Sequence, residues 1–264
     1  MRRLFSRRFR PGRVAVMRLH GSIGGGRTTE WVELARRLRE NRRVAAVVID
    51  IDSPGGSASA SDNLYLAFER LAAKKPVVAA ISGAGASGAY LAAVAARRIV
   101  AGPTSVVGSI GVISVAPRLP QLLDRLGVRV EEHTAGSLKG MGAPWREGAE
   151  AESVKEQALV DAIYEAFVSR VATARKLPTE RVRELATGEV WLGSESVGLG
   201  LVDEIGDLER AVEIAAKMAH VPAKPVSARL PRPLFGRLVD RFATRVARSI
   251  ADEIEVRLGD HLRM

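Results

Sequence analysis

The most constraining feature of this sequence is a regular alternation of short apolar runs with segments of helical periodicity. Three apolar runs occupy residues 14–19, 44–52 and 76–81, and the second is apolar almost throughout. A nearly continuous apolar run of this length is typical of a strand that is buried on both faces. The alternation predicts an α/β fold with a mainly parallel sheet and helical layers, whose ligands lie beyond the carboxyl ends of the strands.

The segments between and after these runs complete the predicted order. Trp31, Leu34, Ala35 and Leu38 have the spacing of one buried helix face. We expect helices at 60–71, 87–98 and 119–126, strands at 106–114 and 128–132, and mostly helices from 150 to 219 apart from a loop and strand at 190–202.

The formal net charge of +10 is concentrated at the two ends of the chain. Residues 1–13 hold six arginines and no acid, and residues 221–264 hold nine basic residues against five acidic ones, which leaves 25 of each for residues 14–220. A neutral body gives no support to nucleic-acid binding, whereas basic ends favour anionic lipid or an acidic partner. We therefore divide the chain into a basic segment at 1–13, a domain at 14–220 and a C-terminal region at 221–264.

The C-terminal region begins with a proline-containing linker at 221–233 and continues as an apolar stripe at helical spacing. The stripe consists of Phe235, Val239, Phe242, Val246, Ile250 and Ile254. It predicts an amphipathic helix that docks on protein or, alternatively, on a lipid surface.

The longest uncharged run, residues 76–96, is long enough to span a membrane, but it starts as a β-branched strand and continues with glycines around a turn. The arginine-rich start contains no apolar stretch of a secretory signal peptide. We therefore expect neither a signal peptide nor a transmembrane segment, and a location in the cytoplasm or at the periphery of a membrane. Because cysteine is absent, disulfides and thiolate zinc sites are excluded, and we expect no metal and no cofactor.

Two glycine-rich turns, at 52–56 and 82–89, follow predicted strands at the edge where parallel sheets place their sites. Glycine lets backbone N–H groups point at a substrate, although such a turn can also be a plain connection. Ser87 lies in the second turn as a candidate nucleophile, but a serine hydroxyl needs a base. The turn departs from the G-x-S-x-G pattern at its last position and the four histidines are scattered, so an α/β-hydrolase triad is not expected.

Lysine is the remaining familiar base for a serine nucleophile. Lys139 is one of only seven lysines, against 33 arginines, and it stands in the glycine-bracketed loop 133–142 after a predicted strand. Its amine accepts a proton near neutral pH only when it is desolvated. The alternative is a mobile surface lysine.

Five segments occur in a characteristic order: Asp52-Ser53-Pro54-Gly55-Gly56, Ala86-Ser87-Gly88, Gly108-Ser109-Ile110-Gly111-Val112-Ile113, the lysine loop and Gly198-Leu199-Gly200-Leu201-Val202-Asp203. Together they resemble the signal peptide peptidase A family of serine peptidases, which has a ClpP/crotonase-type fold. The resemblance implies that Ser87 is the nucleophile, Lys139 the general base and Ser109 the residue that orients the lysine amine. It also implies an oxyanion hole formed by the N–H groups of Gly56 and Gly88.

The resemblance further implies a homo-oligomeric ring, an octamer, in which the serine and lysine of one site come from adjacent protomers. The expected substrates are apolar peptides, such as signal-peptide remnants or other membrane-derived peptides. The family's lysine loop usually reads K-S-G-x-x-K-D, whereas this one reads Thr134-Ala135-Gly136-Ser137-Leu138-Lys139-Gly140 and lacks the first lysine and the aspartate. Typical members begin with a membrane-spanning helix, so this chain resembles a short, single-repeat form for which we expect peripheral membrane contact.

Two other functions remain open on the same fold. A crotonase-type enzyme acting on an acyl-CoA thioester would share the two N–H donors, but it normally uses carboxylates for acid and base chemistry. No convincing acid stands beside the second glycine turn, whereas Ser87 does. A non-catalytic scaffold would have no reason to keep Ser87, Ser109 and Lys139 together.

Overall fold

The computed structural model describes residues 12–230. The predicted C-terminal amphipathic helix and almost all of the basic N-terminal segment therefore lie outside the described residues. The chain divides into two compact units at Ala228, and the structure described below is that of the first unit.

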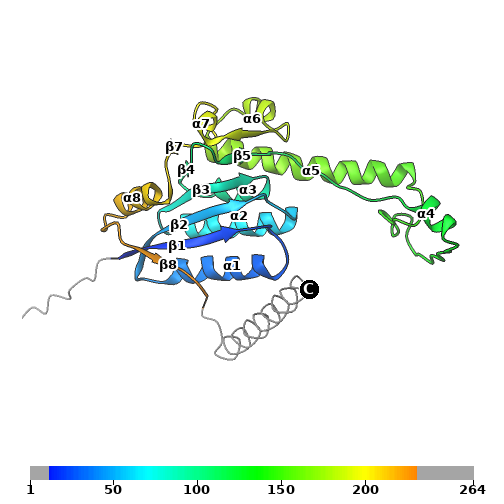
Figure 1. Cartoon of the computed structure of the whole chain (residues 1–264), viewed down its shortest axis with the longest axis horizontal. Helices are drawn as coiled ribbons and strands as arrows, with labels where there is room; N and C mark the ends of the chain where they lie inside the picture. Colours follow the sequence, from blue (N-terminus) through cyan, green and yellow to red (C-terminus); the bar gives the residue numbers. More distant parts are fainter. Residues whose placement is uncertain (1–11, 231–264) are drawn as a thin grey trace, which may run out of the picture. The chain divides into compact units, whose positions relative to one another are not determined.

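One mainly parallel sheet forms the centre of this unit (Figure 1). Its strands are β1 (Arg13–His20), β2 (Val44–Ser53), β3 (Val77–Ala86), β4 (Arg98–Ala101), β5 (Val106–Gly108), β6 (Val190–Leu192), β7 (Glu204–Ile205) and β8 (Pro225–Ser227). The order is β6-β5-β3-β2-β1-β8, with β4 paired to both β3 and β7. Only β6 runs antiparallel to its neighbour, so the predicted mainly parallel α/β fold is confirmed.

Helices cover both faces of the sheet. They are α1 (Gly25–Glu40), α2 (Ala58–Ala72), α3 (Gly88–Ala93), α4 (Pro120–Arg125), α5 (Glu150–Arg175), α6 (Thr179–Leu185), α7 (Gly193–Ser196) and α8 (Leu208–Met218). The face of α1 that the sequence predicts to be buried is buried. Helix α8 packs on the valines and alanines of β1 to β4 that point to its side, so the alternating side chains of the strands fill two apolar layers.

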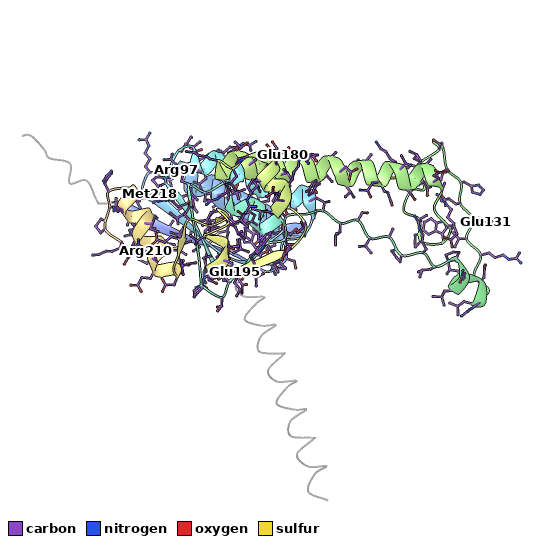
Figure 2. The ribbon with its side chains drawn as sticks, turned by 90° about the horizontal axis from the view of Figure 1, so that it is seen from above. Arg97, Glu131, Glu180, Glu195, Arg210 and Met218 are labelled. Atoms are coloured by element: carbon purple, nitrogen blue, oxygen red, sulfur yellow. The ribbon has the colours of Figure 1, made fainter. Side chains whose placement is uncertain are left out.

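The segment 113–149 and the first half of α5 project from the sheet, and we call them the arm (Figure 1). In α5 the buried residues are Phe167, Val168, Val171 and Ala172 in its second half and Glu152 near its start, and elsewhere on the arm Ala143 is buried. Large apolar side chains are exposed on the arm: Ile113, Val115, Leu119, Leu122, Leu126, Val128, Val130, Trp145, Val154, Leu159 and Ile163. Figure 2 shows Glu131 far out on the arm, away from Arg97 and Glu180 on the body.

Several element boundaries differ from those predicted. The strand expected at 128–132 is wrong, because this part of the arm has no neighbouring strand in the described chain to pair with. The helix expected at 87–98 ends at Ala93, since the chain turns back to form β4 beside β3. The strand expected at 106–114 ends at Gly108. The predicted linker contains β8, which pairs with β1.

Within residues 12–230, no helix combines the length and apolar character needed to cross a bilayer. The uncharged run 76–96 instead forms β3 and α3.

Candidate active site

Ser87 lies at the junction of β3 and α3, in a backbone conformation that only special positions adopt. Its φ of 53° and ψ of −126° lie outside the ordinary regions for a residue with a side chain. The Ser87 N–H donates to the carbonyl of Gly108 at 2.8 Å, and the Ser87 carbonyl accepts from the N–H of Leu91 at 3.0 Å. Hydrogen bonds on both sides thus hold a strained turn whose side chain is only partly buried. Strain of this kind clusters at functional sites.

The turn after β2 approaches Ser87 closely because it consists of glycine. Gly55 has a φ of 93°, and a Cβ added there would lie 2.8 Å from the backbone N of Gly88 and 2.9 Å from the Cβ of Ser87. Gly56 is held by a bridge to Ile23, whose N–H donates to the Gly55 carbonyl and whose carbonyl accepts from Ser57. The two glycine-rich turns predicted to form the site therefore lie side by side.

The backbone N–H groups of Gly56 and Gly88 are arranged as two donors that could bind an oxyanion. Neither N–H has a hydrogen-bond acceptor within residues 12–230. A Cβ added at Gly88 would lie 3.7 Å from the Gly56 nitrogen, which places both donors in one small region beside Ser87. Two unused N–H groups next to a candidate nucleophile are what the stabilisation of a tetrahedral oxyanion requires.

Ser109 is brought to the same edge by the pairing of β5 with β3. Gly108 pairs with Ala86, so Ser109 and Ser87 are the next residues on two adjacent strands. Ser109 also has a positive φ, of 50°, and its N–H donates to the carbonyl of Glu189 at 2.6 Å. The structure therefore brings together Ser87, Ser109, Gly56 and Gly88.

Lys139 is not brought to Ser87 within one chain. It is exposed in a turn of the arm, where its backbone N–H donates to Gly136 at 3.1 Å. All hydrogen bonds of the described residues 118–149 stay within 118–152 or the following turn of α5, so nothing ties the lysine loop to the edge of the sheet.

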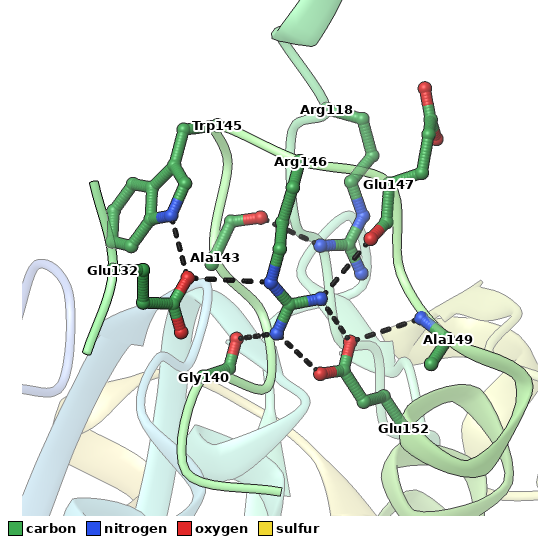
Figure 3. Close-up of polar contacts among 9 residues, drawn as sticks. All are labelled: Arg118, Glu132, Gly140, Ala143, Trp145, Arg146, Glu147, Ala149 and Glu152. Carbon is green, nitrogen blue, oxygen red and sulfur yellow. Dashed lines mark hydrogen bonds and ion pairs between the residues drawn. The ribbon is translucent and has the colours of Figure 1, made fainter. Parts of the chain in front are cut away.

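An arginine cluster that sequence reasoning missed holds the lysine loop in shape (Figure 3). The Arg146 guanidinium donates to the Gly140 carbonyl at 2.9 Å, directly after Lys139, and to both carboxylate oxygens of Glu152 at 2.6 and 3.2 Å. Its Nε also reaches Glu132 at 3.4 Å, and Trp145 donates to the same carboxylate at 2.8 Å. Arg146 is thus the central contact of the loop.

The carboxylate of Glu132 lies where a side chain at position 140 would point. A Cβ added at Gly140 would lie 2.0 Å from Glu132 Oε1. The family's loop has an aspartate at this position, so Glu132 and Arg146 occupy the space that its side chain would need. The sequence signal that could have indicated this cluster is Glu152, an acidic residue in the first turn of a predicted helix. In the structure Glu152 also accepts from the N–H of Ala149 at 3.2 Å.

We expect Arg146→Ala to loosen the lysine loop while leaving the sheet intact. The hydrogen bond and charge of Arg146 lower the pKa of Glu152 from its usual 4.5. A carboxylate with a lowered folded pKa stabilises the fold above its ordinary pKa, and this contribution is lost as the pH falls through the lowered value. The protection factors of the amides in 132–149, measured against the intrinsic exchange rate at each pH, should therefore fall in Arg146→Ala at pH 7, and in the wild type only as the pH falls through the lowered pKa of Glu152.

Arg181→Ala, which removes an exposed ion pair on α6, is the control for this experiment and should leave exchange in 132–149 unchanged. Slow exchange in that segment for Arg146→Ala would contradict the role of the cluster.

Ser82, Asp50 and His20 form a second cluster of polar side chains at the same edge of the sheet. Their hydrogen bonds do not follow the serine–histidine–aspartate order of a catalytic triad. Ser82 donates to Asp50 Oδ1 at 2.8 Å, and His20 contacts Asp50 Oδ2 at 3.0 Å. The carboxylate thus separates the hydroxyl from the imidazole, and within residues 12–230 neither a histidine nor a lysine contacts Ser82. Within the described residues there is also no cluster of His, Asp or Glu that could hold a metal ion.

Comparison with known proteins identifies the fold and the family. A solved structure of a ClpP1 point mutant from Listeria monocytogenes superposes with a TM-score of 0.52, covering 74% of this chain and 93% of that chain at 16% sequence identity. This likeness confirms the ClpP/crotonase-type fold.

Curated relatives are similar in sequence over most of this chain. They include the chloroplastic serine protease SPPA of Arabidopsis thaliana, with 34% identity over 79% of this chain, and a putative protease of Synechocystis sp., with 34% identity over 86%. Protease 4 of Salmonella typhi is 35% identical over 76%. This chain spans 33% of the Arabidopsis protein, 82% of the Synechocystis protein and 32% of the Salmonella protein.

A family model agrees with these relatives. Residues 69–222, which include Ser87, Ser109 and the whole arm, match Peptidase family S49. The resemblance seen in the sequence motifs is therefore confirmed, and the chain belongs to peptidase family S49, a family of serine peptidases.

Proposed function

We propose that this protein is a serine endopeptidase in which Ser87 is the nucleophile and Lys139 the general base. The observation that carries the proposal is the strained Ser87 turn, whose side chain stands beside the two unused N–H groups of Gly56 and Gly88. Ser109, on the neighbouring strand, would donate a hydrogen bond to the lysine amine and orient it.

The proposed reaction needs no group beyond these residues and water. Ser87 Oγ attacks the peptide carbonyl carbon while its proton passes to the neutral amine of Lys139. The oxyanion accepts hydrogen bonds from Gly56 and Gly88, and the C–N bond breaks as the lysine ammonium returns its proton to the leaving amine. Water then hydrolyses the acyl-serine ester by the same route, which regenerates Ser87.

We propose that the lysine of each site comes from a neighbouring protomer. Lys139 lies on the projecting arm rather than at the edge that carries Ser87, and the arm exposes a series of large apolar side chains. Burial of this arm on a second copy would cover the apolar surface and would exclude water from the lysine, which a lysine base requires. Head-to-tail contacts of this kind close into a ring, and the family resemblance favours an octamer.

We expect extended apolar peptides, such as signal-peptide remnants, to be the preferred substrates. Residues 82–89 around Ser87 are glycine, alanine and serine, and residues 82–96 carry no charged side chain. The charged residues that contact this turn are Asp50, which accepts from Ser82, and Asp52, which accepts from the N–H of Ala84 at 3.0 Å. Backbone groups at strand ends bind extended peptides through main-chain hydrogen bonds. A library of fluorogenic peptides should show faster cleavage, by about tenfold, with leucine or alanine than with lysine or glutamate beside the scissile bond.

Two results would argue against this function. Hydrolysis of an acyl-CoA thioester without any peptide cleavage would favour the crotonase-type alternative, and the absence of both activities from assembled rings would favour a scaffold. Faster cleavage beside charged residues would contradict the substrate class only.

Membrane contact through residues 1–13 and through the apolar stripe of 235–254 stays a prediction, because nearly all of these residues lie outside the described part of the chain.

A further inference from the structure

Five parallel strands start at one edge of the sheet, and a basic residue lies at or just before each start. In spatial order the strands are β8, β1, β2, β3 and β4. We call this edge the amino edge, and its cations are Lys224, Arg13, Arg42, Arg43, Lys74, Lys75, Arg97 and Arg98. Neighbouring strands lie about 4.8 Å apart, so the row extends over about 20 Å.

The pairing register places these residues side by side. Arg13 pairs with Val44, directly after Arg43, and Val14 pairs with Pro225, directly after Lys224. The N–H of Arg13 donates to the carbonyl of Arg43 at 3.0 Å. Arg42, Arg43, Arg13 and Lys224 are exposed, so they form one continuous basic surface.

Little acidic charge neutralises the amino edge. Lys74 pairs with Glu40 at 3.3 Å and Arg98 pairs with Asp203 at 3.3 Å. Lys75 and Arg97 donate to backbone carbonyls at the ends of α1 and α2, which leaves their charge uncancelled. Within residues 12–230, six of the eight cations therefore have no acidic partner: Arg13, Arg42, Arg43, Lys75, Arg97 and Lys224.

The opposite edge of the sheet has a different character. The loops that follow the strands there, at 20–24, 52–57, 82–88, 102–105 and 108–111, contain no lysine or arginine. A row of cations thus lies at the amino edge, whereas the loops at the Ser87 edge carry none, and the cation nearest to them is Arg27, which donates to the His20 carbonyl at 3.1 Å. Arg97 lies at the same end of the body as Met218, the last residue of α8 (Figure 2).

We propose that the amino edge is a docking surface for an anionic lipid bilayer. A flat row of exposed cations matches the negative surface potential of such a membrane, where each contributes independently. Residues 1–13 join the sheet at this edge through Arg13, and they combine arginines with Leu4, Phe5 and Phe9, a composition suited to a lipid surface.

The aromatic side chains of the body favour lipid over single-stranded nucleic acid as the partner. Binding of single strands relies on exposed aromatic side chains that stack on bases. The segments at the starts of these strands, 12–14, 40–44, 73–77, 96–98 and 222–226, contain no aromatic residue, and the aromatic side chains of α1 to α3 are buried: Trp31, Tyr65, Phe68 and Tyr90. The amino edge therefore offers charge without a stacking platform.

Docking by the amino edge has a consequence for catalysis that rests on the proposed function. Strand β2 has ten residues, and a strand rises about 3.3 Å per residue. The Ser87 turn would then stand about 30 Å from the bilayer surface, so peptides would reach the site only after leaving the membrane.

The test compares vesicle binding of the full chain with that of two variants of equal charge change. One is Arg42→Gln/Arg43→Gln/Lys224→Gln, and the control is Arg27→Gln/Lys155→Gln/Arg181→Gln, which alters other surfaces. In sedimentation with phosphatidylcholine vesicles containing about one third phosphatidylglycerol, the amino-edge variant should bind about 100-fold more weakly, at about fivefold for each charge near the surface. The control should stay within about threefold of the wild type, because its cations lie away from the bilayer.

Equal binding of both variants would overturn the proposal and would assign lipid binding, if any, to the chain ends. The proposal would also be overturned if the wild type bound vesicles of pure phosphatidylcholine as tightly as it binds vesicles that contain phosphatidylglycerol. A parallel titration with single-stranded and duplex DNA decides the partner, since loss of DNA binding alone in the amino-edge variant would assign the surface to nucleic acid. Cleavage of a soluble peptide should be unchanged in the amino-edge variant, which keeps this result separate from the proposed peptidase function.

Discussion

Replacing Ser87 by alanine, or Lys139 by alanine, is expected to reduce peptide hydrolysis by about 10⁴-fold or more while leaving the fold and the assembly unchanged. Nucleophile and base act as one unit, so either loss removes most of the catalysis. Initial rates on a fluorogenic apolar peptide, together with the oligomeric mass of each variant, provide the measurement. Activity near that of the wild type in either variant would exclude the proposed dyad.

Co-expression of the two inactive variants should restore activity if the dyad is shared between protomers. Where a protomer with an intact Ser87 meets a neighbour with an intact Lys139, one complete site forms. Random mixing in equal amounts makes about one quarter of the interfaces complete, because each partner is the required one half of the time. A ring that is shown to contain both variants but stays inactive would place serine and lysine in one chain.

A mixture of the wild type with a double variant provides a second test of whether the dyad is shared. Wild type co-expressed in equal amounts with the double variant Ser87→Ala/Lys139→Ala should retain about one quarter of the activity if the dyad is shared, and about one half if it lies within one chain. Poor mixing and a dyad within one chain would both leave the first mixture inactive and the second at one half, so co-purification of two differently tagged variants must first show that the rings are mixed.

Gly88→Ala is expected to lower kcat by about 10²–10³-fold, the loss that follows removal of one oxyanion donor. The added Cβ would lie 1.9 Å from Ser61 Oγ and 2.7 Å from Ser61 Cβ. Ser61 is buried in α2 and its hydroxyl donates to the Ser57 carbonyl at 2.9 Å, so it has little freedom to move. The start of α3 must shift instead, and the Gly88 N–H and Ser87 shift with it.

A second substitution can restore the space. Ser61→Gly in the Gly88→Ala background removes both contacts and should recover much of the lost kcat, whereas Ser61→Ala removes only the hydroxyl contact and should recover less. Ser61→Gly alone is the control and should cost about 1 kcal/mol of stability, because glycine weakens a helix. Full activity of Gly88→Ala would contradict the expected displacement of the Gly88 N–H and Ser87 by the added Cβ.

The sequence by itself determined the local features of this protein. The apolar runs at 14–19 and 44–52 became β1 and β2, and the buried face of α1 followed from its spacing, because burial on a sheet leaves a periodic pattern in each segment. The glycines at 55 and 56 could also be recognised, since a close approach of two turns requires residues without a side chain. The serine peptidase family followed from motifs of this local kind.

Only the tertiary structure decided which distant residues meet. Position 128–132 has the composition of a strand but has no partner strand in the described chain, and the pairing of a strand is a property of its neighbours. Arg146 contacts Glu132 and Glu152, a cluster whose members have no common spacing. Cations that are scattered between residues 13 and 224 form one row only because parallel strands start at a common edge. Charge counted along a chain cannot show this row, since it depends on the register of the strands and the direction in which each one runs.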